Sequence, residues 1–364
     1  MKITIWMNIP SHHQSQFFDF IYSKNNGLRV HYYQEVFSER EEMGWSSTFN
    51  LKDYESFVDP NTYTPDALEL KEYVHIILGY SHKFTRKLRD FFCQNNITWV
   101  HWSEKATPGW KWYLSYPRKR LHAYYVNKYA LGAFAISQYA KNDFIKWGIK
   151  PDKIEILPYS FNQLSDCVAD LKILEFKKKR RAFLFVGSLY PLKGIDILLK
   201  AFANEFKNNP EWCLILVGNQ KNNFDYKMMA KELNIEDQVL FRGVVDSKNI
   251  KSVYKACDVF ILPSRYDGWG MVASEALYCG MPVIVSDAAG CSCHIVHPNK
   301  NGHIFKSGSA ENLTEVMRLY KDENTIAEYG KYSSFLFNRY SSEYMSSHFL
   351  NTLSLWLSCN ENIS

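Results

Sequence analysis

Residues 265–287 read RYDGWGMVASEALYCGMPVIVSD, and the fold follows from this stretch. Asp267 and Glu275 bracket a Gly-Trp-Gly turn that opens a predicted helix, and an apolar strand comes next. Glycines in such a turn let backbone N–H groups approach a ligand closely, because no Cβ intervenes. Carboxylates accept paired hydrogen bonds from vicinal hydroxyls, so the pair favours a sugar or ribose ligand. Taken singly, a helix cap at Asp267 and a solvated helix residue at Glu275 remain open.

Short apolar runs alternate with helical patterns along the chain, which predicts a parallel α/β fold. The predicted strands of the first half are Lys2–Met7, Arg29–Tyr33, Val74–Leu78, Ile97–Trp102, Ala133–Ser137 and Ile154–Leu157. Those of the second half are Ala182–Val186, Cys213–Val217, Val239–Phe241, Val259–Leu262, Val283–Val285 and Gly302–Phe305. We expect two doubly wound domains, with ligands bound beyond the carboxyl ends of the strands.

The length of 364 residues also favours about two domains, and the apolar fraction of 46% is that of a folded protein. We expect a first domain over 1–165, a basic linker over 166–181 and a second domain over 182–335. Helices over 336–364 are expected to pack back on the first domain.

A second loop of interest lies in FLFVGSLYPLKGIDILLKAF, residues 183–202. A buried strand ends before Gly187 and Ser188, and Lys193 stands just before a helix that starts at Ile195. The N–H groups and positive dipole at a helix start favour phosphate, and Lys193 adds a charge beside them. The P-loop pattern is absent from this loop.

These motifs together, with FRGVVD at 241–246 and NGHIF at 301–305, resemble the retaining GT-B glycosyltransferases of family 4. The hallmark of that family is a carboxylate, seven residues and then Glu, which here runs from Asp267 to Glu275. The resemblance covers nearly all of residues 182–306. It implies a GT-B fold, in which two Rossmann-like domains face a cleft and the second holds a nucleotide-diphosphate sugar.

The resemblance also implies roles for single residues. Glu275 would bind ribose hydroxyls, and Asp267 would bind the donor sugar and take part in catalysis. The remaining donor-binding positions would be Gly187, Ser188, Lys193, Val244 beside the base, Arg265, and the amides of Gly268, Trp269 and Gly270. Ser188 replaces an Arg that is common in the family, which leaves Lys193 and Arg265 to bind the diphosphate. The expected donor is a UDP-sugar, with a GDP-sugar as the alternative.

The first half is expected to supply the acceptor side and a catalytic group. His101 and Glu104 come at the end of a predicted strand, and a carboxylate there is well placed for function. A structural role for His101 remains open. His13 and Gln14 follow the first strand, Ser137 follows another, and we expect all three on the acceptor side.

The first half is also basic. Residues 1–181 carry 26 Lys or Arg and 19 Asp or Glu, a balance of +7, and the remainder of the chain carries 17 and 19, a balance of −2. Basic residues beside the aromatic run at 99–117 suit an anionic membrane surface. Solvated helix faces remain an equal alternative. Nucleic acid is the competing partner, but no nucleic-acid motif accompanies these residues, so we expect none to bind.

No apolar run approaches the length that spans a bilayer, and the N-terminus lacks the pattern of a signal peptide. We therefore expect a cytoplasmic protein, peripheral on the inner face of the cell membrane. The spacing in CSCHIVHP, residues 291–298, fits no common zinc pattern, and the chain has no Asp-x-Asp. We expect no cofactor and no metal. A phosphorylase, a nucleotide-sugar epimerase and a non-catalytic sugar-nucleotide-binding relative remain alternatives to a hexosyltransferase for a glycan or lipid-linked acceptor.

Overall fold

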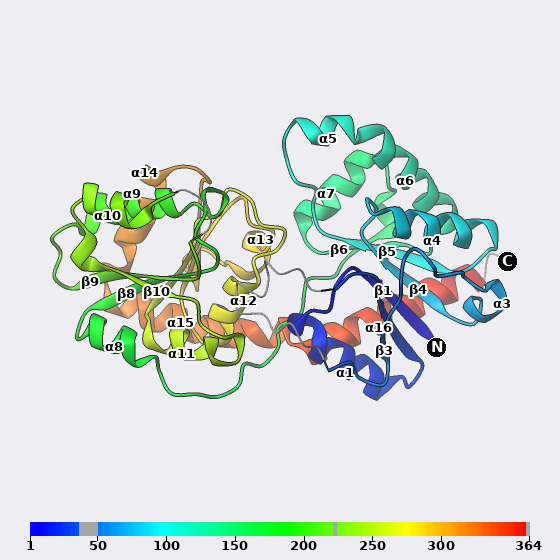
Figure 1. The fold of residues 1–364 in the computed structure, drawn as a ribbon, viewed down its shortest axis with the longest axis horizontal. Helices are drawn as coiled ribbons and strands as arrows, with labels where there is room; N and C mark the ends of the chain where they lie inside the picture. Colours follow the sequence, from blue (N-terminus) through cyan, green and yellow to red (C-terminus); the bar gives the residue numbers. More distant parts are fainter. Residues whose placement is uncertain (36–49, 221–223, 362–364) are drawn as a thin grey trace. The chain divides into compact units, whose positions relative to one another are not determined.

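Two parallel β-sheets organise the chain in the computed structural model, which describes residues 1–35, 50–220 and 224–361 (Figure 1). Each sheet belongs to its own compact unit. The first unit comprises residues 1–35, 50–162 and 340–361, and the second comprises 163–220 and 224–339. The predicted doubly wound α/β architecture is confirmed in both units. None of the described helices is both long enough and apolar enough to cross a bilayer.

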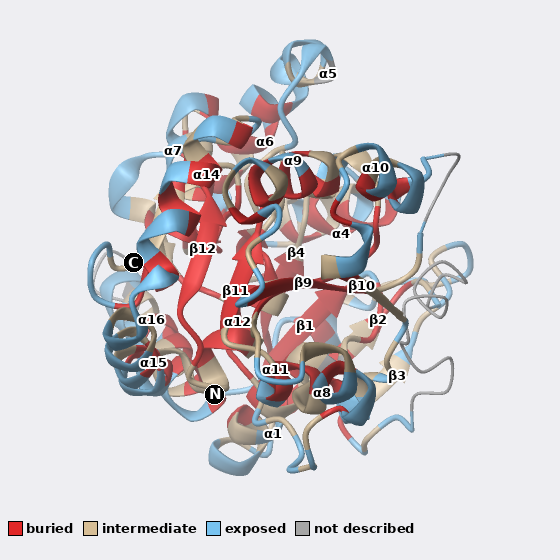
Figure 2. Ribbon diagram, turned by 90° about the vertical axis from the view of Figure 1, so that its left-hand side faces the viewer, coloured by how far each residue is buried: buried red, intermediate tan, exposed pale blue. Residues whose placement is uncertain are grey.

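The first unit has seven parallel strands in the order β3-β2-β1-β4-β5-β6-β7. Their bounds are β1 Ile3–Met7, β2 Leu28–Tyr32, β3 Glu55–Phe57, β4 Val74–Leu78, β5 Trp99–Ser103, β6 Ala133–Ala135 and β7 Ile154–Ile156. The helices are α1 Ser15–Lys24, α3 Ala67–Leu70, α4 Lys83–Gln94, α5 Trp110–Leu114, α6 Tyr116–Tyr129, α7 Gln138–Trp147 and α16 Ser342–Glu361. Every residue of β1 is buried, as parallel sheets covered on both faces require (Figure 2).

The second unit has six parallel strands in the order β10-β9-β8-β11-β12-β13. Their bounds are β8 Arg181–Val186, β9 Trp212–Val217, β10 Val239–Gly243, β11 Val259–Leu262, β12 Val283–Ser286 and β13 Gly302–Phe305. The helices are α8 Leu171–Lys177, α9 Ile195–Phe206, α10 Tyr226–Glu232, α11 Ile250–Ala256, α12 Met271–Tyr278, α13 Ser292–Ile295, α14 Ala310–Arg318 and α15 Glu323–Phe337.

Helix α16 packs against α1, although the two lie at opposite ends of the sequence (Figure 1). The buried Phe349 of α16 anchors this contact. Its ring centroid lies 5.7 Å from that of Phe17, 5.4 Å from that of Phe134 and 6.3 Å from that of Trp102. The last helix is therefore part of the core of the first unit.

Residues 166–181, which we expected to be a linker, contain helix α8 and belong to the second unit. Asp170 caps α8 by accepting a hydrogen bond from the backbone N–H of Ile173. The Asp170 carboxylate also receives Arg242, with Nη2 to Oδ2 at 2.7 Å. The basic composition of this stretch suggested a linker, but the stretch forms a capped helix that is linked to strand β10 by the Asp170–Arg242 ion pair.

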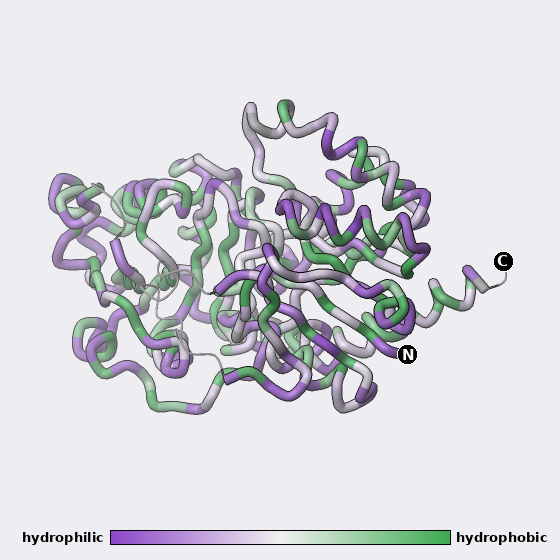
Figure 3. Tube along the Cα trace, turned by 45° about the vertical axis from the view of Figure 1, so that its right-hand side comes forward, coloured by the Kyte–Doolittle hydropathy of each residue, from purple (hydrophilic) through white to green (hydrophobic). Residues whose placement is uncertain are grey.

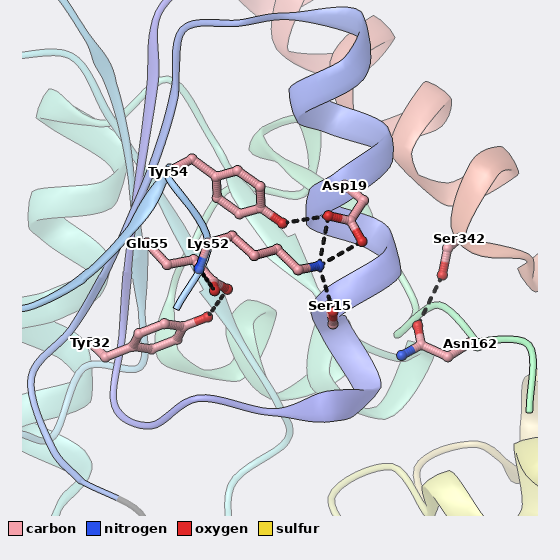
Figure 4. A network of polar contacts seen from close by, with 8 residues as sticks. All are labelled: Ser15, Asp19, Tyr32, Lys52, Tyr54, Glu55, Asn162 and Ser342. Atoms are coloured by element: carbon pink, nitrogen blue, oxygen red, sulfur yellow. Dashed lines mark hydrogen bonds and ion pairs between the residues drawn. The ribbon is translucent and has the colours of Figure 1, made fainter. Parts of the chain in front are cut away.

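Strand β3 was missed from the sequence because it is three residues long and largely polar. A polar network holds the segment before it against α1 (Figure 4). Lys52 Nζ lies 2.6 Å from the Asp19 carboxylate, and the hydroxyl of Tyr54 donates to the same carboxylate at 2.8 Å. Glu55 accepts from the hydroxyl of Tyr32 at 2.7 Å, which ties β3 to β2.

Candidate functional site

The strand order of the second sheet has its switch point between β8 and β11, because the chain builds β9 and β10 on one side and then crosses to the other. In open α/β sheets the ligand crevice lies at the carboxyl ends of the two strands beside that point. The loop after β8 carries Gly187, Ser188 and Lys193, and the loop after β11 carries Arg265 and Asp267. Topology therefore brings the two loops with sequence motifs together.

Lys193 and Asp267 meet directly, with Nζ and Oδ2 2.5 Å apart. Both side chains are largely buried, with exposed fractions of 23% and 15%. The contact depends on Gly194, where a Cβ would lie 2.0 Å from the carbonyl oxygen of Pro263. Gly194 also has a φ of 71°, which suits glycine. A side chain at this position would push the two loops apart.

Arg265, which we expected at the diphosphate, is paired with groups of the second unit in this structure. Its guanidinium forms a paired contact with Asp196, at 2.8 Å and 2.7 Å, and also donates to the carbonyl of Pro191. Burial alone would raise the pKa of the Asp196 carboxyl, but the hydrogen bonds and charge of Arg265 outweigh burial and lower it. An ionised Asp196 in the first turn of α9 occupies the helix start that we expected to bind phosphate.

The Gly-rich turn before α12 rests on the loop that follows β12. The backbone N–H of Gly290 donates to the carbonyl of Asp267, and a Cβ on Gly290 would lie 1.9 Å from the carbonyl oxygen of Gly268. Within the described part of the chain, the N–H groups of Gly268 and Gly270 have no hydrogen-bond partner. These two amides are unsatisfied within the described part of the protein, where Gly268 is half-buried and Gly270 is buried.

Trp269 differs from its neighbours in the turn. Its indole is fully buried, its Nε1 donates to Ser274 Oγ at 3.0 Å, and its ring packs 5.6 Å from that of His294. The indole anchors the turn in the core. Trp269 can therefore contribute no more than its backbone to a ligand.

Glu275 lies half-buried in α12, where it accepts a hydrogen bond from the hydroxyl of Tyr254 at 2.6 Å. The same hydroxyl lies 3.2 Å from the carbonyl of Val272. Burial raises the pKa of Glu275 to about 7, and the bond from Tyr254 opposes that rise. Tyr254, which the sequence did not single out, orients this carboxylate.

Four further polar groups at the carboxyl edge of the second sheet were missed or only partly recognised. Within the described residues, Ser188 Oγ, Ser264 Oγ, Tyr226 Oη and Asn219 Oδ1 are buried and lack a hydrogen-bond partner. Leaving such a group unsatisfied costs about 1–3 kcal/mol, so these atoms mark a place for a polar ligand or solvent. Three of the four follow directly on strands β8, β9 and β11, and that position could have revealed them.

Val244, expected beside the base, is 41% exposed just after β10. Its neighbour Gly243 accepts a hydrogen bond from the N–H of Gly218 at 3.0 Å, which ties the ends of β10 and β9 together. The backbone at Val244 thus lies at the same edge of the sheet as the loops above, on the far side of β9 from β8.

In the first unit, the switch point lies between β1 and β4. Gln14 and His13 lie in the loop after β1, and Gln14 is buried with its Oε1 unpaired among the described residues. Glu104 follows directly on β5, two strands from β1, so the two loops are separated by about 10 Å along the sheet edge. These three residues share one edge.

His101 and Ser137 are both fully buried. His101 is fully buried in β5, its Nε2 lies 2.9 Å from Ser103 Oγ, and burial lowers its pKa to about 3. Its burial favours the structural alternative, and its Nδ1 is buried without a hydrogen-bond partner among the described residues. Ser137 is fully buried and caps α7 by accepting a hydrogen bond from the N–H of Ala140 at 3.2 Å.

The described part of the chain contains no group of three or more His, Cys, Asp or Glu side chains that could hold a metal ion. In the CSCHIVHP stretch, Cys291 is buried, Cys293 is exposed, and His294 packs on Trp269. Cys291, Cys293 and His294 therefore lie in different environments and do not form a cluster.

The fold is that of the GT-B glycosyltransferases. The structure superposes on *Anabaena* Alr3699/HepE in complex with UDP with a TM-score of 0.74 and 17% identity, over 97% of this chain and 100% of that one. Sucrose-phosphate synthase from *Thermosynechococcus elongatus* gives a TM-score of 0.73 with 18% identity, over 98% and 100%. At these identities the likeness establishes the fold.

Residues 169–334 match the family model described as "Glycosyl transferases group 1". The chain is 29% identical over 143 residues to an uncharacterised glycosyltransferase of *Haemophilus influenzae*, over 39% of this chain and 40% of that protein. It is also 29% identical over 157 residues to mannosylfructose-phosphate synthase of *Agrobacterium fabrum*, over 40% and 35%. The chain thus matches these curated relatives over less than half of their length.

The raised pKa of Glu275 makes folding stability depend on pH. A folded-state pKa above the unfolded value of 4.5 means that the stabilisation is present below about pH 4.5 and is lost as pH rises towards 7. Glu275→Gln cannot ionise, so its stability should rise relative to wild type across that interval, by up to about 1.4 kcal/mol per pH unit. Urea unfolding of both proteins at several pH values measures this, with exposed Glu232→Gln as the matched control. A difference that stays constant with pH would contradict the assignment.

Proposed function

We propose that the protein is a retaining, metal-independent hexosyltransferase that uses a nucleotide-diphosphate sugar, with a UDP-sugar favoured over a GDP-sugar. The observation that carries the proposal is the Lys193–Asp267 pair at the switch point of the second sheet, beside the unpaired amides of Gly268 and Gly270. The family match covers the same unit. HepE was crystallised with UDP and with UDP-glucose, which supports the choice of a uridine nucleotide.

In this proposal, each part of the nucleotide-diphosphate sugar has a binding partner in the protein. Glu275, oriented by Tyr254, accepts hydrogen bonds from the ribose hydroxyls, and Asp267 accepts from hydroxyls of the sugar. Lys193 exchanges part of its contact with Asp267 for the diphosphate. The Ser188 and Ser264 hydroxyls and the free amides of the turn supply the hydrogen bonds that an Arg at position 188 would otherwise give, and the backbone at Gly187 and Val244 borders the nucleotide.

The transfer breaks the bond between the anomeric carbon and the diphosphate and forms a bond to the acceptor hydroxyl on the same face of the sugar. Negative charge grows on the leaving diphosphate as the sugar becomes oxocarbenium-like. In this proposal Lys193 and the amides of Gly268 and Gly270 stabilise that charge, because donors held in place before the reaction stabilise developing charge effectively. A diphosphate oxygen takes the proton of the acceptor hydroxyl.

The acceptor side is assigned to Glu104, His13 and Gln14, which share one edge of the first sheet. Because His101 lies in the core, we assign no chemical step to it, and Glu104 positions the acceptor hydroxyl. The acceptor is a glycan or a lipid-linked saccharide in cell-surface polysaccharide synthesis. Such an acceptor places the enzyme at the cytoplasmic face of a membrane, as a peripheral protein.

A panel of nucleotide-diphosphate sugars tests the donor site, scored for slow release of nucleotide diphosphate in EDTA without acceptor. One UDP-sugar should be hydrolysed, and Glu275→Gln should abolish release whereas exposed Glu232→Gln should not. Release that depends on added phosphate would indicate a phosphorylase, and an epimerised sugar without release would indicate an epimerase. No release together with no thermal shift by any nucleotide would contradict the proposal.

Glu104→Gln separates acceptor positioning from donor binding. The variant should keep the affinity for UDP and lose about a hundredfold in turnover with acceptor, because a misplaced acceptor costs roughly that factor. Calorimetry with UDP and steady-state kinetics measure the two quantities, with exposed Glu72→Gln as the control in the same unit. A loss of UDP affinity in Glu104→Gln would show that the residue belongs to the donor site.

A further inference from the structure

Helix α5 exposes an unusual amount of apolar surface. Trp110, Tyr113 and Leu114 are 67%, 74% and 71% exposed, although α5 is only five residues long. Within the first unit, α5 projects beyond the other helices (Figure 2), and Trp112 is half-buried. Aromatic and leucine side chains held out in this way mark a surface that is covered by a partner.

Helix α6 continues that surface on one side only. Lys119, His122 and Val126 face inward, and Lys119 Nζ lies 4.2 Å from the centre of the Trp112 ring. Leu121 and Tyr124 are each 51% exposed on the other side. Among Arg118, Lys119 and Arg120, Lys119 is therefore a core residue and does not belong to an exposed basic surface.

The guanidinium of Arg120 forms a hydrogen bond within the protein, because its Nη1 donates to the carbonyl of Trp147 at 3.1 Å. Arg118 is exposed, and Lys128 lies one further step along the helix with its Nζ 3.1 Å from the hydroxyl of Tyr124. Arg118 and Lys128 thus border the exposed Leu121 and Tyr124.

The chain segment that forms this surface carries charge of a single sign. Residues 105–142 contain no Asp or Glu at all and seven Lys or Arg, namely Lys105, Lys111, Arg118, Lys119, Arg120, Lys128 and Lys141. Hydrophobic and hydrophilic residues are mixed along α5 and α6 in the upper part of Figure 3. The surface combines positive charge with aromatic rings and leucines.

We propose that Trp110, Tyr113, Leu114, Arg118, Leu121 and Tyr124 form a docking surface for an anionic lipid bilayer. Trp and Tyr side chains favour the headgroup region, leucines enter the acyl boundary, and cations are attracted to anionic headgroups. The occupant is a bilayer and not a nucleic acid, because exposed Leu114 and Leu121 have no favourable contact with a phosphate backbone. A short apolar surface with few cations gives reversible binding.

The inference of a docking surface rests on the proposed function in one respect. Its purpose would be to bring the first unit to a lipid-linked acceptor. Its residues lie on α5 and α6 and are separate from those assigned to the donor. Release of nucleotide diphosphate from a soluble donor needs no lipid, so variants of the docking surface should leave that activity unchanged. Failure of docking and failure of the proposed function are therefore distinguishable.

Sedimentation of the full chain with phosphatidylcholine vesicles, with and without phosphatidylglycerol, tests docking. Wild type should bind the anionic vesicles, less strongly as salt is raised. Arg118→Gln combined with Lys128→Gln should weaken binding about 25-fold, since each cation near the surface contributes about fivefold. Trp110→Ser combined with Leu114→Ser should weaken it about tenfold or more. Lys172→Gln with Lys179→Gln, two exposed cations of the second unit, removes the same charge and should bind as wild type.

Each variant is first checked for an unchanged melting temperature and circular dichroism spectrum, so that a folding defect is not read as lost docking. Equal loss in the control pair would show that binding depends on net charge alone and would overturn the proposal. Absence of binding to anionic vesicles, with a labelled RNA oligonucleotide retained instead, would overturn it in favour of nucleic acid.

Discussion

The close approach of Gly194 to Pro263 is the constraint on which the candidate donor site depends. Because position 194 has no side chain, the start of α9 lies directly against the end of β11, and the backbone N–H of Arg265 reaches the carbonyl of Leu192 at 2.8 Å. That contact brings Lys193 within reach of Asp267. The two loops at the switch point thereby act as one rigid frame, in which charged groups are held in place before any ligand arrives.

Buried polar residues fall into two groups, those that have hydrogen-bond partners inside the protein and those that have none among the described residues. Arg265 and Asp196 are fully engaged with each other, and the buried Ser137 caps a helix. Ser188 and Ser264, by contrast, are equally buried and have no partner among the described residues. A buried polar group that the protein leaves unpaired costs free energy, so it persists where a ligand or solvent completes it.

The sequence predicted the second unit well, since strands such as Val259–Leu262 are short apolar runs between clear turns, and their order follows from parallel α/β topology. The Asp267–Glu275 spacing located the candidate site. What it could not predict were long-range pairings: Arg265 with Asp196, Asp170 with Arg242, and the inward turn of Lys119. Each depends on which side of an element faces a neighbour distant in sequence. The role of His101 could not be decided from the sequence for the same reason. Its ring packs against His122 of α6 and Phe144 of α7, which are distant in the sequence.

Hydrogen exchange of the full chain with and without UDP tests the central claim, that the loops after β8 and β11 form the nucleotide-diphosphate site. We predict slower exchange in peptides covering residues 187–195 and 264–276 when UDP is bound, with little change over α14 and α15. Protection confined to the first unit, or no protection in either loop at saturating UDP, would contradict the account.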